Sequence, residues 1–214
     1  MHKYLTELLG VFFLSLTAIL ATTGNYGLMA PVAIGAILAG LTEVGKELSG
    51  AHFNPVVSIA MLIRGKIDRI DIVYYVIAQV LGGVLAGVIA VFLMQSSHSS
   101  IPEIVERQNA ALTATIGELL GAFVWTMAAL HVAMKKEVSE RNGLLLGVTL
   151  TALILTFRDI SGAMFNPAIA VGCMITGMNF WADLPVYIFG PLLGAGAAAS
   201  VFYWIEKAPK EEYY

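Results

Sequence analysis

Two short motifs combine residue types that can interact with a polar molecule. Residues 49–55 read Ser-Gly-Ala-His-Phe-Asn-Pro, and 161–167 read Ser-Gly-Ala-Met-Phe-Asn-Pro, 112 positions later. The asparagine side chain carries uncharged hydrogen-bond donors and an acceptor. Proline suits the first turn of a helix. Each copy therefore predicts an amide side chain at the start of a helix, within a sequence that is otherwise strongly apolar.

The composition is that of an integral membrane protein. Hydrophobic residues make up 58% of the chain and charged residues 13%, with a mean hydropathy of +0.80. A soluble domain carries nearly twice that share of charge. The predicted surroundings are therefore the lipid bilayer. A single cysteine, Cys173, excludes an internal disulfide. The sequence has no basic stripe for nucleic acid, no metal-ligand cluster and no cofactor motif.

Six stretches are long and apolar enough to cross a membrane, which needs roughly 20 residues. Two further apolar pieces are too short to cross, and each begins at Asn-Pro. The sequence thus predicts an all-α membrane protein with six transmembrane helices and two re-entrant half-helices. The six expected spans are Tyr4–Thr23, Leu28–Glu47, Asp71–Gln95, Ala111–Met134, Asn142–Phe157 and Trp181–Ile205, and the short pieces are Asn54–Ile63 and Asn166–Met178.

The repetition extends beyond the motif. Glu7-Leu8-Leu9-Gly10 returns as Glu118-Leu119-Leu120-Gly121. We expect one channel domain over 1–214, made of repeats at about 1–95 and 111–207. Three crossings per repeat is an odd number, so the second repeat must be inverted relative to the first. The half-helices then enter from opposite faces and meet near the membrane centre.

The loop charges orient the chain. Lys and Arg concentrate on one predicted face, which by the positive-inside rule is cytoplasmic and holds both termini. We expect the plasma membrane. The cytoplasmic set is Lys3, Lys46, Arg64, Lys66, Arg69, Lys135, Lys136, Arg141, Lys207 and Lys210, against Arg107 and Arg158 outside, with 96–110 as the long external connection.

Small residues gather where helices should touch. One stripe comprises Gly82, Gly83, Ala86 and Gly87, and another comprises residues 194–198, Gly-Ala-Gly-Ala-Ala. Small side chains let helix backbones approach closely in lipid, so both stripes predict packing contacts.

Two opposed half-helices would create a particular electrostatic environment. The first backbone N–H groups of a helix lack intrahelical partners, and the peptide dipoles leave a partial positive charge there. Two such ends facing each other oppose a cation or proton, whereas a neutral solute does not meet that barrier. Asn54 and Asn166 would add amide donors at the same place. Simple helix capping by each Asn is compatible with this role.

The paired motif, with Glu in the first helix of each half, resembles the aquaporin or major intrinsic protein family over nearly the whole chain. The resemblance implies one pore per subunit and a homotetramer. It places Asn54, Pro55 and Val56, with Asn166, Pro167 and Ala168, at the midplane, Val56 departing from the usual Asn-Pro-Ala. It also implies that Glu7 and Glu118 brace the motif loops, and His52 matches a motif histidine for which loop bracing and a pH gate both stay open.

The same resemblance implies a second constriction nearer the outside. Its four positions correspond to Ile34, Ile154, Ala163 and Ile169, an entirely apolar set in which Ile169 stands where arginine is usual. Arg158 and Asp159 lie at the external mouth. Either they form a local ion pair, or Arg158 directs its guanidinium into the pore.

These residues predict a passive channel, and not an enzyme, for water or small uncharged solutes. Candidate solutes are hydrogen peroxide, ammonia, small alcohols or glycerol, undissociated weak acids and gases, with ions and protons excluded. Alternatives are a poorly conducting protein with a structural or adhesive role, or a secondary transporter, although few ionisable groups are available for ion coupling. An intramembrane serine protease is a further alternative, but only one motif copy carries a histidine.

Overall fold

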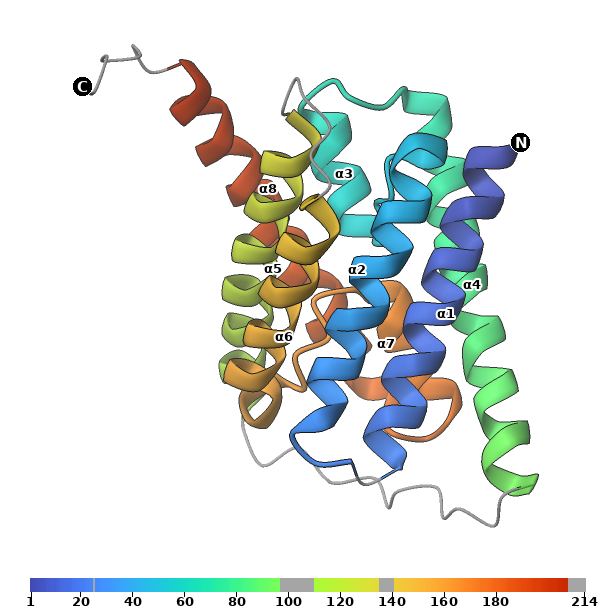
Figure 1. Cartoon of the computed structure of the whole chain (residues 1–214). Helices are drawn as coiled ribbons and strands as arrows, with labels where there is room; N and C mark the ends of the chain where they lie inside the picture. The colour runs from blue at the N-terminus through green and yellow to red at the C-terminus, as the bar shows by residue number, and fades with distance from the viewer. Residues whose placement is uncertain (25, 97–109, 135–140, 208–214) are drawn as a thin grey trace.

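The computed structural model describes residues 1–24, 26–96, 110–134 and 141–207, and the regular structure within them is helical (Figure 1). Six long helices each contain a window apolar enough to cross a membrane. The predicted all-α architecture of six long helices plus short helices is confirmed. The elements are α1 (His2–Thr23), α2 (Met29–Ser49), α3 (Pro55–Ile63), α4 (Arg69–Ser96), α5 (Ala111–Met134), α6 (Asn142–Ser161), α7 (Pro167–Ile175), the 3-10 turn η1 (Trp181–Asp183) and α8 (Leu184–Lys207).

Some sequence predictions fall on parts of the chain that are not described. Most of the external connection 96–110 lies outside the described residues, as do four of the loop cations used to orient the chain, namely Arg107, Lys135, Lys136 and Lys210.

The two halves of the chain interlock. α1 packs against α4 as α5 packs against α8, and α2 packs against α6 between the halves. The half-helices cross over: α3 contacts α8, and α7 contacts α4, as well as the last helix of their own half. Figure 1 shows α3 in the part of the bundle that holds the start of α1 and the end of α8, and α7 in the opposite part. The short helices therefore approach the middle from opposite ends.

The C-terminal ends of two helices differ from the sequence prediction by three or more residues. α6 continues to Ser161, beyond the expected end at Phe157. Its last turn includes two exposed charged residues, Arg158 and Asp159, which do not need to be apolar to remain helical. Gly162, with φ of 92°, then ends that helix in the left-handed conformation. α7 ends at Ile175 and not at Met178, because Gly177, with φ of 79°, turns the chain.

A glycine pair sets the crossing of α2 and α6. A Cβ atom on Gly35 would lie 2.4 Å from the carbonyl oxygen of Gly147, and one on Gly147 would lie 2.4 Å from the oxygen of Gly35. The two residues are 112 positions apart and thus occupy equivalent places in the two repeats. The pseudo-two-fold axis therefore passes between α2 and α6 at this contact.

The small-residue stripe of α4 also makes backbone contacts. A Cβ on Gly82 would lie 2.4 Å from the Leu8 oxygen of α1, and one on Gly83 would lie 2.0 Å from the Ala168 oxygen of α7. In α8, Gly194 is equally close to α5, but a Cβ on Gly196 would meet no atom of the described residues within 4 Å. Within the described part of the chain, Gly196 therefore makes none of the close contacts expected of the second stripe.

Gly35→Ala should destabilise the protein, because its new methyl group would collide with a helix backbone that cannot move away without opening the α2–α6 contact. We expect a loss of about 1–3 kcal/mol, seen as a lower melting temperature in detergent. Gly40→Ala in the same helix is the matched control, since a Cβ there would meet no atom of residues 1–24, 26–96, 110–134 and 141–207 within 4 Å. Equal melting temperatures for the two variants would contradict the crossing described above.

Candidate functional site

The loops leading into α3 and α7 have an unusual backbone conformation. Ala51 and Phe53 have φ angles of 51° and 48°, and Ala163 and Phe165 have φ angles of 52° and 47°. Non-glycine residues in this left-handed region cost about 1–3 kcal/mol each and persist only where surrounding contacts hold them. The contacts that hold these loops are therefore part of the site.

Glu7 of α1 is fully buried and holds the first loop. Its Oε1 accepts hydrogen bonds from the Ser49 hydroxyl at 2.6 Å and the His52 backbone N–H at 3.0 Å. Its Oε2 accepts from the Phe53 backbone N–H at 2.6 Å and the Gln79 side-chain amide at 2.8 Å. A buried carboxylate needs such donors, and the loop N–H groups need an acceptor.

Glu118 of α5 repeats the arrangement in the second half. Its Oε1 accepts from the Ser161 hydroxyl at 2.7 Å and the Met164 N–H at 3.0 Å, and its Oε2 accepts from the Phe165 N–H at 2.6 Å. The two carboxylates thus fix both loops in the same way. Both glutamate side chains are fully buried. A charged side chain that only marked the end of a helix would be exposed.

Each carboxylate is followed three residues later by a glycine that receives a motif phenylalanine. A Cβ on Gly10 would lie 2.1 Å from the Phe53 ring, and one on Gly121 would lie 2.0 Å from the Phe165 ring. The repeated Glu-x-x-Gly segment is therefore a single unit. Its glutamate accepts the phenylalanine N–H, and its glycine leaves room for the ring.

The two asparagines connect the loops to each other. Asn54 Nδ2 donates to the Phe165 carbonyl at 2.9 Å, and Asn166 Nδ2 donates to the Phe53 carbonyl at 2.8 Å. Both asparagines are buried. Because an amide nitrogen carries two hydrogens, each side chain keeps a second N–H after this bond. The two half-helix N-termini are thus joined by a reciprocal pair of hydrogen bonds.

The asparagines also cap their helices. Asn54 Oδ1 accepts the Val56 N–H and Asn166 Oδ1 accepts the Ala168 N–H, each at 3.0 Å. Pro55 and Pro167 are the first residues of α3 and α7. The capping interpretation and the donor interpretation are therefore compatible, because they use different atoms of the same amide.

His52 is held on the wall of the first loop. Its ring Nδ1 lies 3.0 Å from the Ser58 hydroxyl, and the ring lies 5.2 Å from the Tyr75 ring, centroid to centroid. The Tyr75 hydroxyl in turn donates to the Ser49 carbonyl at 2.7 Å. These contacts connect the imidazole to the same network that Glu7 holds.

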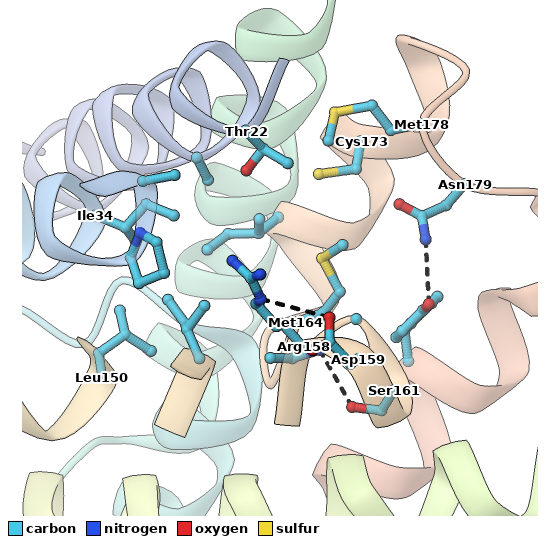
Figure 2. A pocket seen from close by; sticks show the side chains of 18 of the residues that line it. Thr22, Ile34, Leu150, Arg158, Asp159, Ser161, Met164, Cys173, Met178 and Asn179 are labelled. Carbon is cyan, nitrogen blue, oxygen red and sulfur yellow. Dashed lines mark hydrogen bonds and ion pairs between the residues drawn. The ribbon is translucent and has the colours of Figure 1, made fainter. Parts of the chain in front are cut away.

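A cavity of about 680 Å³ is lined by residues of α1, α2, α6 and α7 and of the loop between α6 and α7. Figure 2 shows it from close by, with Ile34, Leu150 and Thr22 among its labelled residues. All four residues expected at the outer constriction line it, and three of them are buried. Those four are Ile34, Ile154, Ala163 and Ile169.

Arg158 and Asp159 also line this cavity. Arg158 Nε lies 3.4 Å from Asp159 Oδ1, and the Arg158 and Asp159 side chains are 39% and 87% exposed. Figure 2 shows the guanidinium among the cavity-lining side chains. The Arg158 guanidinium thus pairs with Asp159 and at the same time forms part of the cavity wall. Arg158 follows Ile154 by one helical turn, so that the charge lies outward of the apolar residues.

A sequence model described as Major intrinsic protein matches residues 2–203 of this chain. The chain belongs to the major intrinsic protein family. It is 32% identical to "Glycerol uptake facilitator protein-like 6" of Lactiplantibacillus plantarum, over 93% of this chain and 95% of that protein. It is 28% identical to "Aquaporin AqpM" of Methanothermobacter thermautotrophicus, over 95% of this chain and 96% of that protein.

The fold comparison agrees with this assignment. The aquaglyceroporin from Plasmodium falciparum has a similar fold, with a TM-score of 0.79, 22% identity and coverage of 97% of this chain and 96% of that chain. As a member of the major intrinsic protein family, the chain is a multi-pass membrane channel that conducts water or small solutes and is not enzymatic.

Sequence reasoning missed several residues of this channel's site. The side-chain amide of Gln79 donates to both Glu7 and Ser58. In the sequence, a lone amide residue within an apolar span already indicated a functional position. Tyr75 and Tyr187 are 112 positions apart, and both place a hydroxyl by a motif loop; a Cβ on Gly162 would lie 3.1 Å from the Tyr187 oxygen. That repeated tyrosine was also visible in the sequence.

Glu118→Gln should weaken the second loop, because an amide nitrogen would replace one of the two carboxylate oxygens and face N–H or hydroxyl donors. We expect a loss of about 2–4 kcal/mol in stability, seen as a lower melting temperature, together with reduced solute flux. Glu47→Gln, at an exposed position of α2, is the control and should match the wild-type protein. A Glu118→Gln protein as stable as that control would show that the carboxylate does not hold the loop.

Proposed function

We propose that this chain is a passive channel for small uncharged solutes of moderate polarity, with water crossing more slowly. One observation carries the proposal. Ile34, Ile154, Ala163 and Ile169, the residues expected at the outer constriction, line one cavity and are all apolar. In the resemblance drawn from the sequence, Ile169 occupies the position where arginine is usual.

An apolar constriction selects by the number of hydrogen bonds that a solute must give up. A missing arginine removes a fixed charge and five N–H donors. An amide or hydroxyl group that loses its water partners without replacement costs about 1–3 kcal/mol on scales from protein mutations. A small molecule with few polar groups, such as hydrogen peroxide, ammonia or a short alcohol, therefore crosses more readily than a polyol. The relatives named for glycerol uptake and for water make glycerol and water informative comparison solutes.

Charge exclusion is assigned to the midplane. The partial positive charges of α3 and α7 converge where Asn54 and Asn166 bond the opposite loop. Their remaining amide hydrogens can donate to a passing oxygen, which turns the hydrogens of water outward and interrupts a proton wire. The same positive ends oppose a cation, and a neutral solute meets no such barrier.

We also propose a homotetramer in the plasma membrane with both termini cytoplasmic. The orientation is supported by the bias of Lys and Arg in the loops. The start of α1 and the end of α8 lie at the same end of the bundle (Figure 1). Apolar side chains exposed on the long helices, such as Leu85 and Phe92 of α4, provide a surface for lipid or for neighbouring subunits.

The selectivity is tested by stopped-flow flux through reconstituted vesicles, with water, glycerol, hydrogen peroxide and a short alcohol as solutes. Ile169→Arg should lower the peroxide-to-water and alcohol-to-water permeability ratios about tenfold, because the guanidinium adds donors and fills space. Ile169→Leu keeps an apolar side chain and should retain the wild-type ratios. If Ile169→Arg leaves every permeability unchanged, the outer constriction lies elsewhere. Wild-type flux at the level of protein-free vesicles for every solute would contradict a channel function.

Asn166→Asp should reduce charge exclusion. The variant replaces the donor to the Phe53 carbonyl with a carboxylate oxygen and adds negative charge at the half-helix N-termini. We expect a measurable proton or cation leak in vesicles loaded with a pH-sensitive dye. Gln95→Glu, the same chemical change at an exposed position of α4, should remain tight. A tight Asn166→Asp variant would mean that the asparagines do not control charge exclusion.

A further inference from the structure

The pseudo-two-fold axis allows residues of the outer pore to be matched with residues of the inner pore. Equivalent residues meet twice on this axis: Gly35 contacts Gly147, and Asn54 and Asn166 exchange equivalent hydrogen bonds. Both pairs are 112 positions apart. A rotation that exchanges the repeats therefore also exchanges the outer and inner halves of the pore.

This rotation maps the outer constriction onto a set of residues in the other half of the bundle. All four residues of the mapped set, called here the inner set, are buried. Three are apolar, as in the outer constriction, and the fourth is a threonine. The inner set is Leu146, Thr42, Ala51 and Val57, which correspond to Ile34, Ile154, Ala163 and Ile169 respectively.

The Thr42 hydroxyl differs from those of other helical threonines in this protein. Thr149, Thr151 and Thr156 each donate to the carbonyl one turn earlier in α6, at 2.8–3.0 Å. Thr42 is 1% exposed, and its hydroxyl has no hydrogen-bond partner among the described residues. Burial of an unpaired hydroxyl is unfavourable, so this group is expected to find a partner that is not part of the protein.

Two other buried hydroxyls, those of Ser15 and Thr126, also lack a partner among the described residues. They are 111 positions apart, the spacing that relates Glu7 of α1 to Glu118 of α5, so the rotation exchanges them with each other. Neither lines the outer cavity. Thr42 is different because its equivalent, Ile154, does line that cavity. The geometry therefore singles out Thr42.

We propose that the Thr42 hydroxyl faces the cytoplasmic half of the pore and forms a hydrogen bond with each passing solute. The inner set is then a second constriction that offers one hydroxyl group, in series with the entirely apolar outer one. It favours small neutral molecules with a hydroxyl group, such as hydrogen peroxide or a short diol, which can both donate to and accept from Thr42. This inference rests on the proposed channel function and makes Thr42 a specificity-determining residue.

Thr42→Val tests the inference, because valine has nearly the shape of threonine without the hydroxyl. The variant should lose about fivefold to tenfold in permeability to hydrogen peroxide and ethylene glycol in reconstituted vesicles, the effect of one lost hydrogen bond at a barrier. Its melting temperature should be unchanged or higher, since an unpaired buried hydroxyl has been removed. Thr42→Ser keeps the hydroxyl and should restore most of the flux.

Thr156→Val is the matched control, because Thr156 is exposed and already donates to the Ala152 carbonyl. It should conduct both solutes as the wild-type protein does. Wild-type permeability in Thr42→Val overturns the inference, and so does a loss of flux accompanied by a fall in melting temperature. Wild-type flux equal to that of protein-free vesicles instead overturns the proposed channel function, and this inference with it.

Discussion

The polar backbone groups of the two motif loops need hydrogen-bond partners that regular helical bonding does not supply. Polar backbone groups at membrane depth are tolerated only where protein covers them or where they border an aqueous path. In this chain Glu7 and Glu118 each accept two loop N–H groups, and Asn54 and Asn166 each donate to a carbonyl of the opposite loop. At about 1–3 kcal/mol for each unsatisfied group, the loss of this network would equal much of a domain's stability.

That constraint explains why distant sequence features repeat together. A loop that ends in Phe-Asn-Pro needs a buried acceptor for its N–H groups, space for its phenylalanine ring and a partner loop for its asparagine. The acceptor and the space come from Glu-x-x-Gly on the first helix of the same half, and the partner loop comes from the other half. Neither half can complete its motif loop alone, so α3 and α7 depend on the interlocked packing against α8 and α4.

The sequence predicted the architecture because its signals are local. Apolar length revealed the six spans, and Asn-Pro followed by a short apolar run revealed the half-helices. The predicted end of α6 was wrong because hydropathy does not report that a helix continues through exposed charged residues such as Arg158 and Asp159. The donor role of Gln79 depends on the distance between two helices, which no local pattern encodes. The reciprocal asparagine bonds likewise needed the relative placement of two loops.

Symmetry and selectivity are separate properties of this channel. The axis through Gly35 and Gly147 fixes equivalent backbone positions in the two half-pores, but it does not fix which side chains occupy them.

Under the proposed function, a solute first crosses an apolar ring that offers no side-chain hydrogen bonds, then the amide donors at the midplane, and then the Thr42 hydroxyl. A molecule with many hydroxyl groups is held back at the ring, because the side chains there replace none of its lost hydrogen bonds. A molecule without hydrogen-bonding groups passes the ring but gains nothing from the amides and the hydroxyl. The order of the two constrictions thus favours small solutes that carry one or two polar groups, because these lose little at the ring and recover it on the cytoplasmic side.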